Sequence, residues 1–402
     1  MSGKGKKEGD RVYVDAAALR ARVDELRRAK EWSWREVAAK AGIVERTPER
    51  WKKNENVPSR ESVERVAEIF GLTLDELVAG LPYRAGHSSA PPSSERLAEF
   101  DARARAVGTS FVGRRDELER LQEAIADGHS TNVIGDPLIG KSSLLLELVR
   151  RAREDRQDVV FVDGRSVHSD SPASLVEAIT ESAPGAEPSV AADALVAWVK
   201  ARLRRGRPLI VIDDFDKLAV HLPASFFDRL HGIAGSHQAC FVLATRTHIS
   251  ELRASPEGTI STSAASLVAL FWPLPLPLLD LDAAEALIER AEGWTCLDGP
   301  ELLRRWAGRH PFFIHLLGHH LTRAQRLNKP SAGAVEDFYL EAQPFLEKLW
   351  RRLGHAEQAY LLEEEISFPH RPSARLIRRG LLTEDKAHFG GVLTRWLSEM
   401  TR

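Results

Sequence analysis

Residues 132–143 read Asn132-Val133-Ile134-Gly135-Asp136-Pro137-Leu138-Ile139-Gly140-Lys141-Ser142-Ser143. The stretch contains the pattern GxxxxGKS, which follows a short apolar run and precedes an apolar segment with helical spacing. Glycines let backbone N–H groups turn toward phosphate oxygens, and the lysine neutralises charge on the β- and γ-phosphates. The N-terminus of the following helix adds its positive dipole end. The stretch therefore predicts a phosphate-binding loop for ATP or ADP, in which every residue from Gly135 to Ser143 takes part.

A second strand-like run ends in acidic residues. It reads Pro208-Leu209-Ile210-Val211-Ile212-Asp213-Asp214-Phe215-Asp216. The carboxyl ends of parallel strands meet at one edge of a sheet, where ligands bind. We expect Asp213 and Ser142 to hold Mg²⁺ and Asp214 to orient or deprotonate the attacking water, with Asp216 as the alternative base. Together the two motifs predict binding of a nucleoside triphosphate and the acidic residues needed for phosphoryl transfer.

Composition limits the remaining function classes. The chain has 402 residues, a formal charge of −2 and 43% hydrophobic residues, which suits two or three globular domains. The apolar run 271–279 is interrupted by Pro273, Pro275 and Pro277 and is too short to cross a bilayer. Cys240 and Cys296 are too few for a disulfide scaffold or a four-ligand zinc site. We therefore expect a cytoplasmic protein without a membrane segment.

Residues 12–82 show a five-helix pattern. We expect the preceding residues, 1–11, to form a disordered tail. Amphipathic spacing predicts helices over 15–29, 33–41, 46–53, 60–70 and 74–79. Ser33 begins a capping-box sequence, and Gly42 ends the second helix. The segment resembles the phage-repressor (Cro-like) helix-turn-helix family. The matching residues are Val37-Ala38-Ala39-Lys40-Ala41-Gly42-Ile43, Trp51, Pro58 and Val66-Ala67-Glu68-Ile69-Phe70-Gly71-Leu72.

That resemblance implies a partner, double-stranded DNA, whose major groove would receive the third helix. The matching contact positions are Arg46, Thr47, Arg50 and Lys53, and arginine favours guanine edges. Residues 1–82 contain 17 basic and 15 acidic residues, a net charge of +2, which is a faint electrostatic footprint for DNA. Docking of the head to a protein is therefore the alternative.

From residue 109 onward the pattern changes to alternating strands and helices. Residues 83–108 contain Pro91, Pro92 and several serines, which predicts a linker. Apolar runs predict strands over 131–135, 158–163, 208–213 and 240–245, with helices between them. This alternation predicts an α/β P-loop NTPase core with a parallel, doubly wound sheet over 109–280.

Three further motifs accompany the two nucleotide motifs in a fixed order. They are Phe111-Val112-Gly113-Arg114, Leu243-Ala244-Thr245-Arg246 and Gly308-Arg309-His310-Pro311. Together the five motifs resemble the STAND branch of AAA-like P-loop ATPases over residues 111–400. The resemblance implies that Val112 contacts adenine through its backbone, with Gly113 and Arg114 also binding the nucleotide. It further implies that Arg246 senses the γ-phosphate and that Pro311 packs on the base.

The resemblance also implies the organisation of the C-terminal part. It places a helical lid over 281–333 and a winged-helix domain over 334–402 that locks the resting state; a plain helical cap is the alternative. No repeat of 20 to 50 residues follows, so the activating signal would come from a separate sensor or effector protein or from DNA. STAND proteins also suggest homo-oligomerisation in the presence of ATP.

The leading hypothesis is thus an ATP/ADP-dependent signal-transduction switch with a DNA-binding head. It would act as a transcriptional or defence-type regulator. Two alternatives belong to different classes: a DNA-loading AAA-type ATPase of a mobile element, and a nucleotide-bound scaffold that never hydrolyses ATP and docks proteins through its head.

Overall fold

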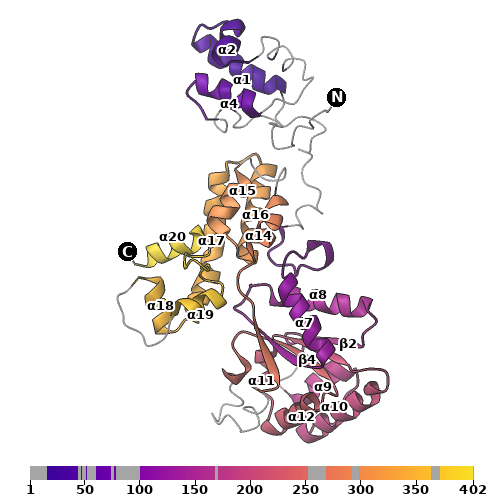
Figure 1. The fold of residues 1–402 in the computed structure, drawn as a ribbon. Coiled ribbons are helices and arrows are strands. Elements are labelled where there is room, and N and C mark those ends of the chain that lie inside the picture. Colours follow the sequence, from indigo (N-terminus) through magenta and orange to yellow (C-terminus); the bar gives the residue numbers. More distant parts are fainter. Residues whose placement is uncertain are drawn as a thin grey trace. The chain divides into compact units, whose positions relative to one another are not determined.

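A computed structural model shows the protein as two compact units. It describes residues 16–43, 47, 51, 60–73, 77, 100–167, 171–251, 269–291, 298–363 and 372–401. The first unit is Met1–Leu97 with Gly293–Leu297 and Thr322–Pro330. The second is Ala98–Glu292 with Asp298–Leu321 and Ser331–Arg402. Figure 1 colours the elements of both units along the sequence.

The first unit contains, among its described residues, the helices α1 (Ala16–Ala29), α2 (Trp34–Lys40) and α4 (Arg60–Ile69). The predicted capping box is confirmed at the start of α2, where Ser33 Oγ accepts a hydrogen bond from Glu36 N and the Glu36 carboxylate accepts one from Ser33 N. Gly42 follows the helix with φ 61°, as expected for a helix end. The unit has its own apolar core, formed by Leu19, Val23, Val37, Ala41, Trp51, Val63, Val66, Ala67 and Leu77.

The expected DNA-reading helix, 46–53, lies mostly outside the described residues. Thr47 and Trp51 are described; both have helical backbone, and Trp51 is buried in the core of the unit. Arg46, Arg50 and Lys53 lie outside the described residues. DNA binding by the head therefore stays a prediction.

The second unit is built on a five-stranded parallel sheet. Its strands are β1 (Ser130–Ile134), β2 (Val159–Asp163), β3 (Leu209–Asp213), β4 (Cys240–Thr245) and β5 (Phe271–Pro275). They lie in the order β2-β3-β4-β1-β5. The four predicted strands are confirmed with ends within one residue of those expected. Because β4 lies between β1 and β3, the phosphate loop and the acidic strand end are separated by one strand.

The fifth strand corrects the sequence interpretation, which treated 271–279 only as a proline-interrupted apolar run. β5 contains Pro273 and Pro275 and pairs with β1 at the edge of the sheet. Proline lacks a backbone donor and is tolerated on edge strands, where one side of the strand has no ladder to satisfy. The prolines that hid the strand therefore also indicate its place in the sheet.

Helices cover both faces of this sheet (Figure 1). On one face lie α7 (Arg115–Asp127) and α8 (Lys141–Glu154), and on the other lie α9 (Pro172–Thr180), α10 (Pro188–Leu203) and α12 (Ala224–Gly235). Apolar side chains of α9, α10 and α12 form one buried cluster with residues of β2, β3 and β4. Shorter elements complete this part: η3 (Gly108–Ser110), α11 (Phe215–Ala219) and η4 (Ile249–Glu251).

The C-terminal part is helical in its described residues. Its elements are α14 (Leu281–Glu289), α15 (Gly299–Leu302), the π-helical turn η5 (Leu303–Ala307), α16 (Pro311–Arg326), α17 (Ser331–Trp350), α18 (His355–Leu361), α19 (Pro372–Arg378) and α20 (Gly391–Met400). The expected domain boundary between 333 and 334 is wrong, because it would cut α17 near its start. A short antiparallel bridge joins Leu382 and His388 between α19 and α20, and the winged-helix interpretation stays a prediction. Among the described residues, no helix has both the length and the apolar composition needed to cross a bilayer.

The predicted linker 83–108 is too long. Its last residues, 100–108, belong to the second unit. Phe100 is 1% exposed and packs so closely on α16 that a Cβ at Gly318 would lie 2.3 Å from its ring. Ala106 N donates to Ser143 Oγ at 3.1 Å, and Gly108 N donates to Glu147 Oε2 at 2.9 Å. The two hydrogen bonds are donated by backbone N–H groups, which leave no periodic pattern in the sequence. The sequence therefore did not show that residues 100–108 belong to the second unit.

Candidate nucleotide-binding site

The phosphate loop joins β1 to α8, as the sequence predicted. Gly135 is required for close packing, because a Cβ there would lie 2.8 Å from Ile139 Cγ2. Gly140 has φ 103°, a conformation open to glycine and strained for other residues, and it immediately precedes the first turn of α8. The free N–H groups of that turn and the helix dipole favour a bound anion. The local geometry therefore suits a phosphate group.

Lys141 is 7% exposed, and its ammonium group faces the loop. Nζ donates to Gly135 O at 2.8 Å and to Asp136 O at 3.0 Å. Burial lowers the pKa of Lys141 to about 8, although the nearby carboxylates of Asp136 and Asp213 oppose this shift. The side chain is thus held inside the loop where a phosphate would need a counter-charge.

The low pKa predicts a pH dependence of nucleotide affinity. Phosphate binding requires the charged ammonium group, so above pH 8 binding must be accompanied by uptake of a proton. We expect ATP affinity to be nearly constant up to pH 7 and then to fall by up to about tenfold per pH unit above pH 8. Titration with a fluorescent ATP analogue between pH 6.5 and 9.5 measures this. An affinity that stays flat up to pH 9.5 would contradict the assigned role of Lys141.

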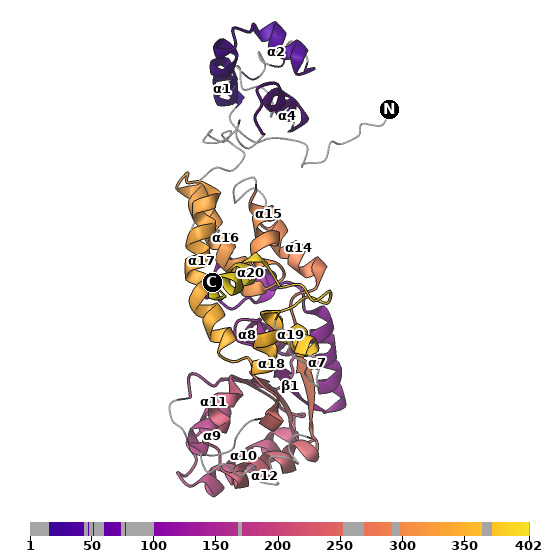
Figure 2. The ribbon, with the colours of Figure 1, turned by 90° about the vertical axis from the view of Figure 1, so that its left-hand side faces the viewer.

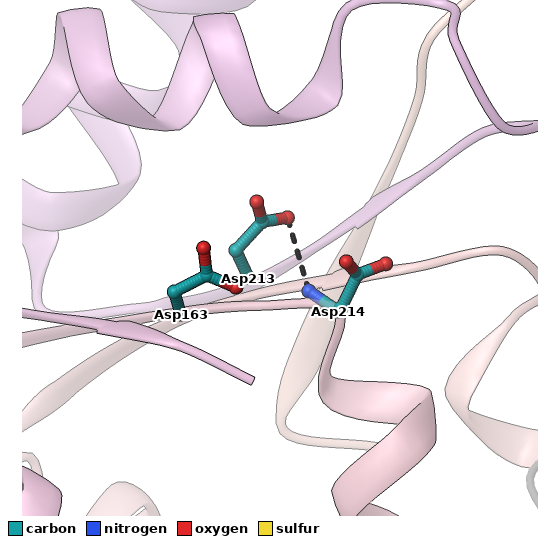
Figure 3. A group of neighbouring side chains, drawn as sticks. All are labelled: Asp163, Asp213 and Asp214. Carbon is teal, nitrogen blue, oxygen red and sulfur yellow. Dashed lines mark hydrogen bonds between the residues drawn. The ribbon is translucent and has the colours of Figure 1, made fainter. Parts of the chain in front are cut away.

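The acidic end of β3 lies at the carboxyl edge of the sheet, as predicted. Asp213 is 1% exposed, and its Oδ1 accepts a hydrogen bond from Asp214 N at 3.0 Å (Figure 3). Asp214 has φ 49° and directly precedes α11, and its carboxylate forms an ion pair with Arg165. The expected base is therefore neutralised by a neighbouring guanidinium group in this structure.

A third carboxylate, which neither sequence motif includes, belongs to this group. Asp163 ends β2 and stands in register with Asp213 on β3. Carboxylate oxygens of Asp163, Asp213 and Asp214 all lie within 4.8 Å of one another (Figure 3). Although burial opposes it, hydrogen bonds from Arg165 N and Arg105 lower the pKa of Asp163. The signal was present, since the predicted strand 158–163 also ends in an aspartate at the same edge.

These residues fit a magnesium ion. Oxygen atoms of carboxylates and hydroxyls are the ligands that Mg²⁺ prefers in proteins. Asp213 Oδ2 is buried, and no described residue donates a hydrogen bond to it. Asp213 would hold the ion together with Ser142, the second ligand that the sequence predicts.

Arg246 follows β4 and, with Asp214 and Lys217, lines a cavity beside the phosphate loop. Its guanidinium group forms an ion pair with Asp216, the expected alternative base. The sequence placed both residues at the carboxyl edge, but it did not predict that they would bind each other. Sensing of a γ-phosphate by Arg246 stays a prediction, and it would require this pair to open.

The three residues of the turn Val112-Gly113-Arg114 make different contacts. Val112 lines the cavity. Gly113 has φ 71°, and a Cβ there would lie 2.4 Å from Ala283 Cβ. Arg114 is 4% exposed and donates to Ile139 O at 3.1 Å, Pro277 O at 2.7 Å and Leu278 O at 3.3 Å. Arg114 therefore holds the phosphate loop against residues 277–278; it also lines the cavity, and its contact with a nucleotide stays a prediction.

A cavity of about 490 Å³ adjoins these residues. Pro311, the first residue of α16, lines this cavity, which is the position needed for the expected contact with a base. The lining combines the phosphate loop, from Pro137 to Ser143, with apolar and aromatic side chains that include Val112, Leu279, Leu287, Pro311, Phe312, His315 and Phe345. This mixture of apolar surface and phosphate-binding backbone suits an adenine nucleotide.

The C-terminal part supplies a contact that the sequence did not predict. Arg379, directly after α19, donates from Nε to Asp136 Oδ2 at 2.7 Å and from Nη2 to Asp136 Oδ1 at 3.1 Å. Its Nη1 donates to Glu357 Oε2 at 3.1 Å and to Arg352 O at 3.2 Å. In Figure 2, α18 and α19 appear at the level of α8 and β1, the two elements that the phosphate loop joins. Asp136, expected to face the nucleotide, is therefore bound by an arginine 243 residues away in sequence.

Comparison with solved structures finds proteins of low sequence identity to this chain. A walker-type ATPase of Pyrococcus abyssi is 13% identical, with a TM-score of 0.49 over 75% of this chain and 99% of that one. The Aeropyrum pernix Orc1 protein in complex with DNA is 20% identical, with a TM-score of 0.41 over 72% and 78%. Domain III of the Thermotoga maritima replication initiation protein DnaA is 13% identical, with a TM-score of 0.40 over 62% and 99%. No curated protein matches the chain.

The family model described as "AAA domain" matches residues 126–252. This range contains β1 to β4, the phosphate loop and the three carboxylates at the sheet edge. These residues therefore form an AAA-type P-loop ATPase domain within the chain.

Proposed function

We propose that the protein is an ATP/ADP-dependent switch of the STAND type, in which the C-terminal part holds the phosphate loop in its resting arrangement. The observation that carries this proposal is the pair of hydrogen bonds from Arg379 to Asp136. Arg379 lies outside the residues that match the AAA domain, whereas Asp136 lies inside the loop that would bind phosphate. A change at the nucleotide can therefore be transmitted directly to the C-terminal part.

Packing supports the same contact. Gly380 has φ 72°, and a Cβ there would lie 2.9 Å from Ile139 Cδ1 and 3.4 Å from Leu278 Cδ2. Arg379 and Gly380 thus touch two different residues of the phosphate loop, and we call these two residues the latch. Asp136 is 3% exposed, and such a buried carboxylate needs charged or hydrogen-bonding partners to be stable. Loss of Arg379 would leave it with the more distant Arg352, at 3.8 Å.

The core residues have distinct tasks in this proposal. Backbone N–H groups after Gly140 bind phosphate oxygens, and Lys141 neutralises the charge of the β- and γ-phosphates. When bound, Mg²⁺ neutralises further phosphate charge; Asp213 and Ser142 would hold it. Asp214 orients the attacking water once Arg165 releases it. Hydrolysis is expected to be slow, because both Asp214 and Asp216 are paired with arginines.

The remaining parts of the proposal rest on the sequence. We propose that the head binds double-stranded DNA through Arg46, Thr47, Arg50 and Lys53 and that the C-terminal part is a winged helix. A separate sensor or effector protein would supply the signal, and ATP would promote homo-oligomerisation. A cytoplasmic transcriptional or defence-type regulator fits this combination best.

Retention of nucleotide tests the switch. We expect freshly purified, denatured wild-type protein to release near-stoichiometric ADP, because the latch restrains the loop around its ligand. Arg379→Ala should release bound nucleotide about tenfold faster, since it removes two charge-assisted hydrogen bonds from the loop. Chromatography of the released nucleotide and chase experiments with a fluorescent analogue measure both quantities.

Arg378→Ala is the matched control, because Arg378 is the exposed neighbour of Arg379 on α19. It should retain nucleotide as wild type does. Protein purified without nucleotide, or equal release rates in Arg379→Ala and Arg378→Ala, would rule out the proposed latch.

A further inference from the structure

Arg105 places a guanidinium group between two of the acidic strand ends. Its Nη2 lies 2.7 Å from Asp163 Oδ2 and 3.8 Å from Asp213 Oδ2. The Arg105 side chain is 32% exposed and lines the cavity, whereas the carboxylate of Asp213 that it covers is 1% exposed. None of the motifs in the sequence includes Arg105, which falls within the stretch expected to be a linker.

The acid group that Arg105 covers is built to hold a cation. Two carboxylates on adjacent strands face each other in register, and a third lies within 4.8 Å. Within the described part of the chain, Asp213 Oδ2 has no hydrogen-bond donor, although it is buried. Two like charges on neighbouring strands, one buried and one 21% exposed, repel each other unless a positive charge lies between them. Arg105 supplies that charge from within the chain.

The segment that carries Arg105 is fixed at both ends. We call residues 101–110 the strap. Before it, Phe100 packs beside Gly318 on α16. After Arg105, Ala106 N donates to Ser143 Oγ, Gly108 N donates to Glu147 Oε2, and Arg290 donates to Thr109 O at 2.8 Å. Residues 101–106 between these anchors line the nucleotide cavity. Movement of Arg105 would therefore change how the strap lies along the cavity.

We propose that Arg105 is an internal counter-cation that competes with a divalent cation for Asp163 and Asp213. Asp163 then becomes a cation ligand beside the predicted ligand Asp213. The guanidinium group and the ion share the same carboxylate oxygens and repel each other, so binding of one releases the other. The link to Mg²⁺ and ATP rests on the proposed function, whereas the competition itself depends only on these three side chains.

Binding of Mn²⁺ to the protein without nucleotide tests the competition directly. Mn²⁺ accepts the same oxygen ligands as Mg²⁺ and can be followed by electron paramagnetic resonance. Arg105→Ala should bind Mn²⁺ about tenfold more tightly than wild type, because the ion no longer displaces a charge-assisted hydrogen bond. Arg105→Lys should lie closer to wild type, since it keeps the charge. Adding Asp163→Asn to Arg105→Ala should abolish the gain.

Arg103→Ala is the matched control, since Arg103 belongs to the same strap and its side chain is 88% exposed. It should bind Mn²⁺ as wild type does. Hydrogen exchange gives a second readout: Mn²⁺ should accelerate exchange at residues 101–108 in wild type, and Arg105→Ala should exchange rapidly with or without the ion. Equal Mn²⁺ affinity in wild type and Arg105→Ala, or no binding by either, overturns the proposal.

ATP titrations separate this proposal from the proposed function. In EDTA, Arg105→Ala should bind ATP more weakly than wild type, because the exposed carboxylates repel the phosphates; Mg²⁺ should restore the affinity. Equal weakening with and without Mg²⁺ would make Arg105 a phosphate ligand and overturn the counter-cation role. A wild-type protein that binds Mn²⁺ as expected but not ATP would overturn the proposed function and leave the competition standing.

Discussion

Replacement of Lys141 by alanine is expected to weaken ATP binding by about a hundredfold to a thousandfold, on the order of 3 to 4 kcal/mol. The ammonium group is buried beside the loop, so the protein would lose its main counter-charge to phosphate in a region where water cannot replace it. Isothermal titration with ATP and Mg²⁺ measures the change. Exchange of ADP for ATP would then lose its effect on the latch.

Lys200→Ala controls for the loss of a lysine, because Lys200 is exposed in the last turn of α10. Its ATP affinity should match that of wild type. The Lys141 variant should also keep its fold, since burial already disfavours the charged form of this side chain. A folded Lys141→Ala protein with wild-type ATP affinity would sink the assignment of the phosphate loop.

Replacement of Gly308 by alanine is expected to destabilise the C-terminal part by about 3 kcal/mol or more. Gly308 has φ 56° and ψ −126°, and a Cβ there would lie 1.6 Å from Phe389 O. The added carbon must therefore push away the segment between α19 and α20, against which His310 and Phe313 also pack. Thermal unfolding, together with hydrogen exchange of residues 381–389, measures the loss.

Gly333→Ala is the control for the added methyl group. Gly333 lies inside α17, and a Cβ there would meet nothing within 4 Å. Alanine is favoured over glycine in a helix by up to about 1 kcal/mol, so this variant should be as stable as wild type or slightly more stable. Unfolding of Gly308→Ala at the wild-type temperature would show that the contact with Phe389 is not formed in solution.

The two proposed contacts meet at the nucleotide site from opposite ends of the second unit's sequence. The strap carries Arg105 to the acidic edge of the sheet, and the latch carries Arg379 to Asp136. Arg105 would compete with a divalent cation for its carboxylates, whereas Arg379 would hold the phosphate loop around its ligand. Nucleotide and metal would therefore act on two separate arginines, which gives the switch two positions that can be tested independently.

The fold of the core was predictable because its strands are short, apolar and bounded by clear turns. Periodicity placed β1 to β4 within one residue, and the phosphate loop and Asp213 followed from their positions at strand ends. β5 was missed because two prolines argue against a strand unless its edge position is known. The predicted boundary between 333 and 334 was wrong because a residue pattern does not reveal whether two adjoining helical segments form one continuous helix.

The sequence by itself determined the chemistry of the site: a loop for phosphate, a lysine to neutralise it and acidic strand ends for a metal. These depend on local backbone geometry and on residues close together in the chain, which motifs record. Only the tertiary structure decided the charge partners, Arg105 with Asp163, Arg165 with Asp214, Arg246 with Asp216 and Arg379 with Asp136. Arginines are abundant and their long side chains reach far, so spacing along the chain does not reveal which carboxylate each one neutralises.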